Sequence, residues 1–496
     1  MNYVSSRNKK DKVESHNAVI HGLAKDGGLY TPESIDIHIN IDELIHQSYQ
    51  DMATTIIHSF LPDYTEEEIK NCVYNAYDSK FDDSSIVPLK KINDGYLMEL
   101  WHGPTSAFKD IALTLLPHLL TTAYQKEKRN DVISILTATS GDTGKAALSG
   151  FADVPHTAIT VFYPEVGVSA VQKKQMQTSI GNNVEVIAVK GNFDDCQRMV
   201  KEATQDSEVL ASLKNVTISS ANSINVGRLV PQIVYYYYSY AQLVKSGEIQ
   251  CGDPVNFSVP TGNFGDILAG YLAYRSGLPI HQLICASNSN NVLTDFLNTG
   301  KYTTHREFVP TMSPSMDILI SSNLERLLFI VSGNDDTFVS NMMESLKKDG
   351  EYTIPEELHQ KISSLFKGYW TNEEACCKTI HDLYNNENVL IDPHTSVGLD
   401  AYKQYRQQTN DQTKTIILST ASPYKFCKDV LRSISNEEVQ DDFEAMERLH
   451  EVTHVSIPKN LACLKDMDVR FTRSINIEDG MHVIAQRMEE IGNDNH

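Results

Sequence analysis

The sequence has 496 residues, 41% of them hydrophobic and 22% charged, which is the composition of an ordinary globular protein with the length of about three domains. Its 65 acidic residues outnumber the 43 basic ones, and the resulting net charge of −22 disfavours nucleic acid and anionic membranes as partners. If the protein has an anionic substrate, its site must be locally basic.

The eight cysteines are scattered along the chain, without a CxxC pair or a Cys/His cluster of zinc-ligand spacing. We therefore expect reduced thiols and no metal. The N-terminus is polar from its first residues and lacks the apolar core of a signal peptide. No run approaches the roughly 20 apolar residues of a membrane helix. These features predict a cytoplasmic protein that contacts no membrane.

Short β-branched runs, small polar turns and helical patterns alternate along the chain. This alternation predicts an α/β fold of mostly parallel sheets covered by helices on both faces. We expect an N-terminal unit at residues 1–92, a large domain at 93–130 and 221–496, and a smaller α/β subdomain at 131–220. The clearest predicted strands are Val132–Ala138, Ala158–Phe162, Val184–Val189, Phe257–Pro260 and Thr415–Leu418.

Lys109 ends the stretch WHGPTSAFK, just before a helical pattern. The apolar residues from Ile111 to Leu120 repeat on one face of a helix, so Lys109 lies at or within its first turn. A lone lysine is usually a solvated surface charge. Phe108 and the apolar face suggest a buried amine instead, and burial lowers the pKa of a lysine and frees it for carbonyl chemistry.

The segment ATSGDTGK, residues 138–145, follows a predicted strand and opens a helix. It is not a P-loop, because Thr139 replaces the first glycine and Ala146 replaces the magnesium-binding hydroxyl. Its hydroxyls and backbone amides suit a carboxylate, although the segment taken alone is more typical of an ordinary turn. The candidate substrate-binding residues here are Thr139, Ser140, Asp142 and Thr143.

Three further segments carry polar groups at the ends of predicted strands. TGNFGD, residues 261–266, combines glycines with a helix N-terminus, a geometry that binds phosphate. Arg228 follows Asn225 by three residues, and arginine grips phosphate with two nitrogens. The hydroxyl of Thr420 follows a buried strand, where it can address a ring nitrogen or cap the turn. A plain glycine turn and a surface ion pair remain alternatives for the first two.

Together these segments resemble the threonine synthase family, whose members are fold type II pyridoxal-phosphate enzymes with the architecture of the tryptophan synthase β subunit. The resemblance rests on ELWHGPT leading to AFKD at 99–110, TSGDTG at 139–144, NSIN at 222–225 with Arg228, TGNFGD at 261–266, and GLAKDGGLY at 22–30. The motifs follow one another in order from about residue 20 to residue 426. Ser106, Ser5-Ser6-Arg7 and Val226-Gly227 depart from the usual family pattern.

The resemblance implies pyridoxal 5'-phosphate as the cofactor, held by Lys109 as a Schiff base. Thr420 would face the pyridine nitrogen, and the turn at 139–144 would receive the α-carboxylate of the substrate. Asn225 and Arg228 are the candidates for the phosphate of the substrate. The residues expected to hold the cofactor phosphate are Gly262, Asn263, Phe264, Gly265 and Asp266.

The reaction implied is the conversion of O-phospho-L-homoserine and water into L-threonine and phosphate, by a monomer or homodimer. One alternative is a related phospholyase that releases a 2-oxo acid and ammonia. Another is a serine or threonine dehydratase of the same fold, which needs no second phosphate site. The third is a non-catalytic sensor that binds the cofactor or a metabolite. The product formed from phosphohomoserine distinguishes among them.

Overall fold

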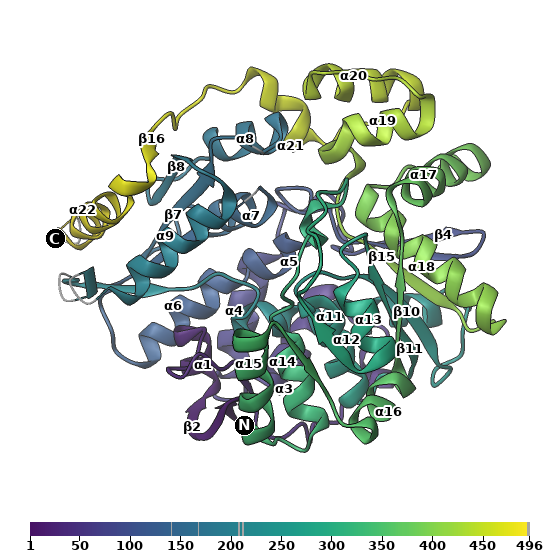
Figure 1. Ribbon diagram of the computed structural model, residues 1–496, viewed down its shortest axis with the longest axis horizontal. Coiled ribbons are helices and arrows are strands. Elements are labelled where there is room, and N and C mark those ends of the chain that lie inside the picture. Colours follow the sequence, from purple (N-terminus) through teal and green to yellow (C-terminus); the bar gives the residue numbers. More distant parts are fainter. Residues whose placement is uncertain (140, 167, 207–208, 211–212, 494–496) are drawn as a thin grey trace.

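Two parallel sheets form the framework of the molecule (Figure 1). The computed structural model describes residues 1–139, 141–166, 168–206, 209–210 and 213–493. The larger sheet has the order β14-β11-β10-β15-β5-β4 and is parallel except for the hairpin of β4 with β5. Its strands are β4 (Leu89–Ile92), β5 (Gly95–Glu99), β10 (Val255–Pro260), β11 (Ile280–Ser287), β14 (Phe366–Trp370) and β15 (Thr415–Ser419).

Neighbouring side chains of the larger sheet enter two different apolar cores. On β11, Leu283 and Cys285 join the core that includes α11 (Val226–Lys245) and α12 (Gly265–Arg275), whereas Ile284 joins the one beneath α18 (Pro393–Thr409). Because side chains alternate along a strand, the sheet is buried on both faces, which explains its continuous apolar runs. Helices on both faces were expected from the sequence.

The smaller sheet has the order β16-β8-β7-β6-β9 and is entirely parallel. Its edge strand β16 comes from the far C-terminal part of the chain, which the expected boundaries assigned to the large domain. The helix α22 (Gly480–Asn493) follows β16 and packs on α9 (Phe193–Gln205) and on β6 and β9. The strands are β6 (Val132–Ala138), β7 (Thr157–Pro164), β8 (Val184–Lys190), β9 (Val216–Ser219) and β16 (Ser474–Asn476).

The first residues form a small antiparallel sheet in the order β2-β1-β3, followed by helices that pack on the rest of the molecule. In particular, α3 (Tyr49–Phe60) contacts α11, so the N-terminal unit supports the helix that carries Arg228. A separate pair, β12 with β13, lies in the large domain. These strands are β1 (Asn2–Ser5), β2 (Asn8–Glu14), β3 (Tyr30–Pro32), β12 (Lys301–Thr303) and β13 (Glu351–Thr353).

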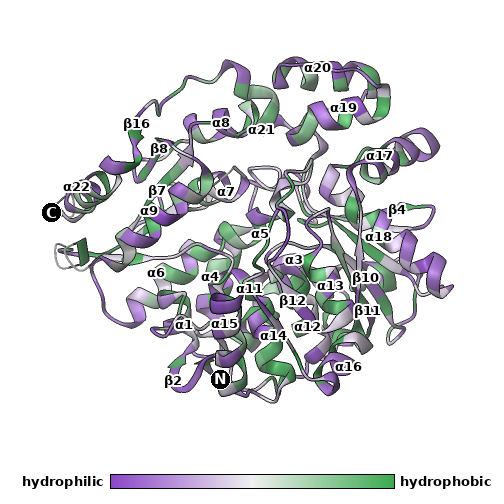
Figure 2. Cartoon of the chain, in the orientation of Figure 1, coloured by the Kyte–Doolittle hydropathy of each residue, from purple (hydrophilic) through white to green (hydrophobic). Residues whose placement is uncertain are grey.

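The remaining helices pack around the sheets and on one another, and hydrophilic residues colour much of α15 and α17 (Figure 2). Within the described ranges, no helix is both long and apolar enough to cross a bilayer. These helices are α1 (Ser15–His21), α2 (Ile41–Leu44), α4 (Glu66–Ala76), α5 (Lys109–Leu113), α6 (Leu116–Lys126), α7 (Asp142–Phe151), α8 (Ala170–Gln177), α13 (Val292–Thr299), α14 (Leu324–Val331), α15 (Asp336–Asp349), α16 (Glu356–Leu365), α17 (Glu373–Glu387), α19 (Cys427–Ser435), α20 (Asp442–Thr453) and α21 (Lys459–Ala462), with 3-10 turns η1 (Pro314–Met316), η2 (Pro423–Phe426), η3 (Cys463–Asp466) and η4 (Ile477–Asp479).

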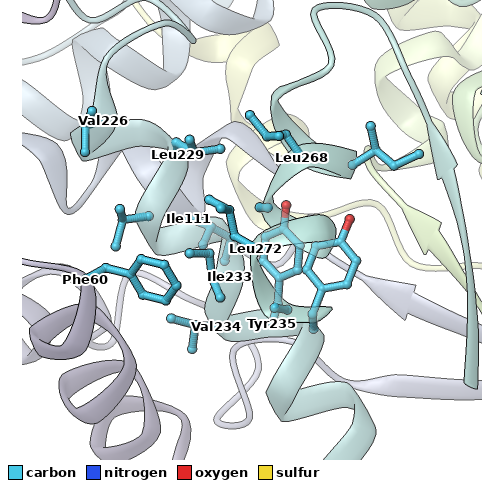
Figure 3. Close-up of a cluster of buried hydrophobic side chains, with 14 of the residues drawn as sticks. Phe60, Ile111, Val226, Leu229, Ile233, Val234, Tyr235, Leu268 and Leu272 are labelled. Atoms are coloured by element: carbon cyan, nitrogen blue, oxygen red, sulfur yellow. The ribbon is translucent and has the colours of Figure 1, made fainter. Parts of the chain in front are cut away.

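The core around α11 joins the N-terminal unit to the large domain (Figure 3). Phe60 from α3, Ile111 from α5, Ile233 from α11 and Leu268 from α12 are all fully buried in it. The helices α11 and α12 approach closely at Gly270, where a Cβ atom would come within 2.7 Å of the ring of Tyr236. This packing fixes the start of α5, α11 and α12 relative to one another.

The helix that follows Lys109 is shorter than its apolar pattern suggested. It is divided into α5 and α6, with residues 114 and 115 between them. Pro117 lies in the first turn of α6 and has no N–H with which to bond the carbonyl of Leu113. That carbonyl is covered by Gly150 of α7, where a Cβ atom would stand 2.0 Å from the oxygen. The apolar face continues across the break because both helices pack on the same core.

Candidate active site

Lys109 is the first residue of α5 and is held beside Thr420 by backbone contacts. Ala107 forms an isolated antiparallel bridge with Ala421, and the N–H of Phe108 donates to the carbonyl of Thr420 at 2.8 Å. The loop before Lys109 is thereby joined to the chain that leaves the carboxyl end of β15. Two residues more than 300 positions apart in the sequence, both expected at the site, therefore meet.

The amine of Lys109 lies in a nearly closed environment, with 11% of the side chain exposed. Its Nζ donates to the hydroxyl of Ser315 at 3.3 Å and lies 3.9 Å from a carboxylate oxygen of Asp142. Burial lowers the pKa of Lys109 to about 8, helped by the charges of Lys425 and Arg228 and opposed by Asp142. Near neutral pH the uncharged amine, which a nucleophile or base requires, is therefore more abundant than in an ordinary lysine.

The turn at residues 262–266 presents backbone N–H groups. Within the described chain, none of these five N–H groups bonds to a protein acceptor, and the start of α12 has no side-chain cap. Phe264 adopts the left-handed conformation, with φ of 62°. Gly262 allows the backbone of Ser315 to pack closely against the turn, since a Cβ atom at position 262 would stand 2.8 Å from the carbonyl oxygen of Ser315. Unpaired amides at a helix N-terminus form an anion site.

Asp266 contributes its backbone to this turn, while its carboxyl bonds elsewhere. The carboxyl accepts hydrogen bonds from Tyr235 at 2.6 Å and from Tyr236 at 2.9 Å, both on α11. Burial raises the pKa of Asp266 to about 6, although the two tyrosine hydrogen bonds act in the opposite direction. The carboxyl at the base of the turn is thus more easily protonated than that of an exposed aspartate.

Arg228 is a buried cation, with 4% of the residue exposed. Its Nη1 donates to the carbonyl of Ala221 at 3.0 Å, its buried Nε has no partner, and no carboxylate pairs with it among the described residues. Burial lowers its pKa to about 10. The guanidinium is also near enough to Lys109 to lower the pKa of that amine. An unpaired buried guanidinium beside a reactive amine suits an anionic ligand.

Asn225 has a different role from the substrate contact expected from the sequence. Its side-chain oxygen accepts from the N–H of Gly227 at 2.8 Å and so caps α11. Its amide nitrogen donates to the carbonyls of Val19 at 3.0 Å and Ser220 at 2.9 Å. Both amide hydrogens are used within the protein, so the residue has no free donor for a phosphate. It instead fixes the helix start from which Arg228 projects.

The turn between β6 and α7 is shaped by Thr139. Its hydroxyl accepts from the N–H groups of Gly141 at 3.0 Å and Gly144 at 2.9 Å. The hydroxyl of Thr143 is half-buried and has no protein partner within the described residues. Ser140, also expected here, lies outside the described residues. This turn therefore offers a hydroxyl and a helix N-terminus next to the carboxylate of Asp142.

Lys425 is a buried site residue that was not singled out in the sequence. Its side chain is 0% exposed, and its Nζ lies 2.6 Å from Asp142 and 3.0 Å from the carbonyl of Thr105. Burial alone raises the pKa of Asp142, but the charges of Lys425 and Lys109 outweigh it and hold the pKa well below its usual range. A signal was present, because Lys425 shares with Thr420 the segment that follows a buried strand.

Ser315 and His394 are two more residues near the amine that were not expected. The N–H of Ser315 donates to Nε2 of His394 at 3.2 Å, while Nδ1 of His394 bonds the buried Asp392 at 2.7 Å. This arrangement places the proton on Nδ1 and orients the imidazole. The dyad holds the segment whose hydroxyl contacts Lys109. A single serine in a loop carries no pattern by which the sequence alone would identify it.

A charge cluster in the N-terminal unit is the one group of metal-ligating composition within the described residues. Ligand atoms of Glu14, His16 and Asp63 lie within 4.8 Å of one another. However, both imidazole nitrogens of His16 already bond carboxylates, Nδ1 with Asp63 and Nε2 with Glu127 at 2.6 Å. The cluster is therefore a set of ion pairs around one histidine.

Family comparisons assign the class of enzyme first. The model of pyridoxal-phosphate-dependent enzymes matches residues 85–421, which include Lys109, both glycine turns and Thr420. The protein is thus a pyridoxal-phosphate-dependent enzyme of fold type II. The models named for the threonine synthase N terminus and C-terminal part match residues 2–77 and 395–479. The chain belongs to the threonine synthase family.

Individual relatives agree with this assignment. The chain is 38% identical to threonine synthase from Pseudomonas aeruginosa, over 86% of this chain and 89% of that protein. It is 36% identical to the enzyme from Saccharomyces cerevisiae, over 87% of this chain and 89% of that one. Among solved structures, pyridoxal-phosphate-bound threonine synthase from Brucella melitensis matches with a TM-score of 0.88 at 34% identity, and the yeast enzyme with 0.89 at 32%; each pair is covered to 99% on both sides.

The residues of this chain fit the cofactor. Lys109 has a buried amine of lowered pKa that would suit its aldehyde, and residues 262–266 have unpaired N–H groups that would suit its phosphate. The hydroxyl of Thr420, in a residue 5% exposed, has no hydrogen-bond partner in the described part of the protein. It is therefore free to meet a ring nitrogen. The N–H groups of the turn and the hydroxyl of Thr420 come from different parts of the chain, and both lie near the amine of Lys109.

Proposed function

We propose that the protein converts O-phospho-L-homoserine and water into L-threonine and phosphate. The observation that carries this proposal is Arg228, a buried guanidinium near Lys109 without a carboxylate partner among the described residues. The turn at 262–266 would already bind the phosphate of the cofactor. A second cationic position is what a phosphorylated amino acid needs and a plain hydroxy-amino acid does not.

Lys109 is the proposed base. Its lowered pKa leaves uncharged amine to take the proton from Cα of the bound amino acid and to carry protons between Cα, Cβ and Cγ. When bound, pyridoxal phosphate withdraws electrons from the substrate carbons and so supports these proton losses. The buried environment of the amine keeps bulk water away while charge develops.

Arg228 and the turn at 139–144 are the proposed contacts of the substrate. Arg228 would hold the phosphate on Cγ and balance its charge as the C–O bond breaks, before water adds at Cβ. Thr143 would bind the α-carboxylate through its hydroxyl, in a turn whose shape Thr139 maintains. Ser140 stays a prediction for the same carboxylate. Thr420, a neutral hydroxyl, would face the pyridine nitrogen without favouring its protonation.

The test is the product formed from phosphohomoserine by the purified, cofactor-loaded protein. We expect L-threonine and phosphate in equal amounts. Arg228→Gln should raise KM for phosphohomoserine at least tenfold, whereas Arg129→Gln, which removes a partly exposed arginine paired with Asp131, should leave KM unchanged. Release of 2-oxobutyrate and ammonia would instead identify a phospholyase. Turnover of serine or threonine at a rate that Arg228→Gln leaves unchanged would identify a dehydratase.

We also propose that the enzyme acts in the cytoplasm as a monomer or homodimer. Its net charge of −22 and its eight free cysteines support a protein that works in a reducing aqueous compartment. Light scattering of the purified chain gives the mass, for which 55.6 kDa or twice that value is expected.

A further inference from the structure

Lys425 stands out because it is a fully buried lysine that no step of the proposed reaction uses. It lies in η2, just beyond the carboxyl end of β15. An ammonium group without solvent is costly unless its hydrogens find partners. Two partners are provided here, a carboxylate oxygen of Asp142 at 2.6 Å and the carbonyl of Thr105 at 3.0 Å.

These two partners belong to different parts of the site. Asp142 is the first residue of α7, which packs on the smaller sheet, whereas Thr105 lies in the loop that leads to Lys109. Thr105 in turn fixes Asp110 of α5 through its N–H at 2.8 Å and its hydroxyl at 2.6 Å. One cation thus ties the start of α7, the loop before Lys109 and the large sheet together.

Asp142 is shared between two lysines. Its Oδ1 lies 2.6 Å from Lys425, and its Oδ2 lies 3.9 Å from Lys109. Gln172 also donates to Oδ1, at 2.9 Å. The ammonium of Lys425 is therefore the nearer counter-charge. Without it, this buried carboxylate would have Lys109 as its remaining cationic partner and would hold that amine in its charged form.

A free carboxylate at the start of α7 would have a second consequence. The turn at 139–144 is the proposed receptor for the α-carboxylate of the substrate, and two carboxylates at one helix N-terminus repel each other. Lys425 cancels the charge of Asp142 from the side that is closed to solvent. The helix N-terminus and the hydroxyl of Thr143 then remain available to an anion.

We propose that Lys425 is a positioning residue that occupies Asp142 as its ion-pair partner, so that Lys109 keeps an uncharged amine and the start of α7 accepts a carboxylate. The first consequence concerns the protein alone, whereas the second rests on the function proposed above. The other charged groups that act on Lys109 are Arg228 on α11, Asp110 on α5 and Asp266 on α12, and all three remain unchanged in the variants tested.

The first experiment measures Lys109 in the full-length chain freed of cofactor. Trace labelling with acetic anhydride at a series of pH values, followed by peptide mass analysis, gives the pH at which half of the Lys109 amine becomes reactive. Lys425→Met should raise this midpoint by about one unit, a tenfold loss of free amine. Asp142→Asn should lower it, and the double variant should return it towards that of the unaltered protein. Lys425→Arg, which keeps the charge, should leave it close to that of the unaltered protein.

A merely structural ion pair predicts a different pattern. In that case Lys425→Met and Asp142→Asn lower the melting temperature by similar amounts and leave the midpoint of Lys109 unchanged, which would overturn the proposal. If Lys425→Met does not fold, the test rests on Asp142→Asn. An unchanged labelling midpoint of Lys109 in that folded variant would also overturn the proposal. Circular dichroism establishes folding in each case.

The second experiment uses the cofactor-loaded enzyme with phosphohomoserine. Lys425→Met should raise KM about tenfold and move the rising limb of the kcat profile, which reports the enzyme–substrate complex in which the Lys109 amine is free, to higher pH. Lys425→Arg should restore both. A KM that stays constant in Lys425→Met would overturn the carboxylate part of the proposal. If the unaltered enzyme does not turn over phosphohomoserine, the proposed function fails, while the labelling of Lys109 still tests the role of Lys425.

Discussion

Two turns of the same construction lie near Lys109, and they differ in what they offer a ligand. Each connects a parallel strand to a helix, and each contains glycines. The turn at 262–266 presents unpaired backbone N–H groups, and the carboxyl of Asp266 is bonded to two tyrosines beneath it. The turn at 139–144 carries the carboxylate of Asp142 directly beside the amine, where Lys425 neutralises it.

The difference matches the two kinds of ligand that the proposed reaction requires. A cofactor stays bound through many turnovers, and unpaired amides provide a site for its phosphate that needs no movement of side chains. A substrate binds and leaves in every cycle, and a turn with a compensated carboxylate has a weaker and more adjustable attraction for anions. We therefore expect changes in the first turn to affect cofactor retention, and changes in the second turn to affect KM.

The largest effect is expected from Lys109→Ala, which removes the group that both turns surround. Turnover should fall by at least ~10³-fold, because nucleophile and base are lost together. The visible absorbance of the bound cofactor should also disappear. Lys361→Ala is the control, since this lysine is largely exposed and pairs with Glu357 on α16. Full turnover in Lys109→Ala, or cofactor attached to another lysine after borohydride reduction, would contradict the assignment.

A smaller but selective effect is expected from Gly262→Ala in the first turn. The new Cβ would meet the carbonyl oxygen of Ser315 at 2.8 Å, so either the turn or the backbone at Ser315 must move. We expect the dissociation constant of pyridoxal phosphate to rise at least tenfold, measured by equilibrium dialysis. Gly265→Ala in the same turn meets only the amide of Asn323, at an ordinary 3.4 Å, and should change it less than threefold. Equal effects would show that space beside Ser315 does not matter.

Thr143→Val tests the second turn. It removes a hydroxyl that has no protein partner among the described residues and keeps the shape of the side chain. One lost hydrogen bond to a carboxylate should raise KM about tenfold, with cofactor binding unchanged. Thr139→Val is the contrasting variant, because it also removes the acceptor of two backbone N–H groups and should lower the melting temperature. Weaker cofactor binding in Thr143→Val would show that the second turn also serves the cofactor, contrary to the division of roles between the two turns.

The parts of the fold that depend on local pattern could be predicted from the sequence. The run Val132–Ala138 is the strand β6 with the same bounds, and both glycine turns lie between strand and helix as expected. Buried parallel strands have continuous apolar runs, so they are visible in the sequence itself. In contrast, β16 has three residues and joins the smaller sheet through a pairing that spans almost 300 positions. No local signal specifies such a partner.

The candidate site divides in the same way. Lys109, Arg228 and Thr420 could be selected because strand ends, glycine turns and a family resemblance mark their surroundings. Lys425 could not, because its importance lies in its burial and in the 2.6 Å contact with Asp142, which are tertiary facts. Asn225 was selected for its neighbourhood, yet its amide caps α11 and bonds two carbonyls. Residue type and spacing identify where polar groups gather, while the hydrogen-bond partners decide which of them remain free for a ligand.

The smallest predicted effect concerns stability and lies outside both turns, at His16 in the N-terminal unit. Burial lowers the pKa of His16, but hydrogen bonds with Glu127 and Asp63 outweigh it, and the folded pKa is raised above the ordinary value of 6.5. The stabilisation is therefore complete below about pH 6.5 and is lost as the pH rises through the folded pKa. His16→Gln should lower the melting temperature by about 1–2 °C at pH 6 and by less at pH 8.5. Comparing the two proteins at each pH cancels the titrations they share, so a pH-independent difference would rule out the charge of His16 as the cause.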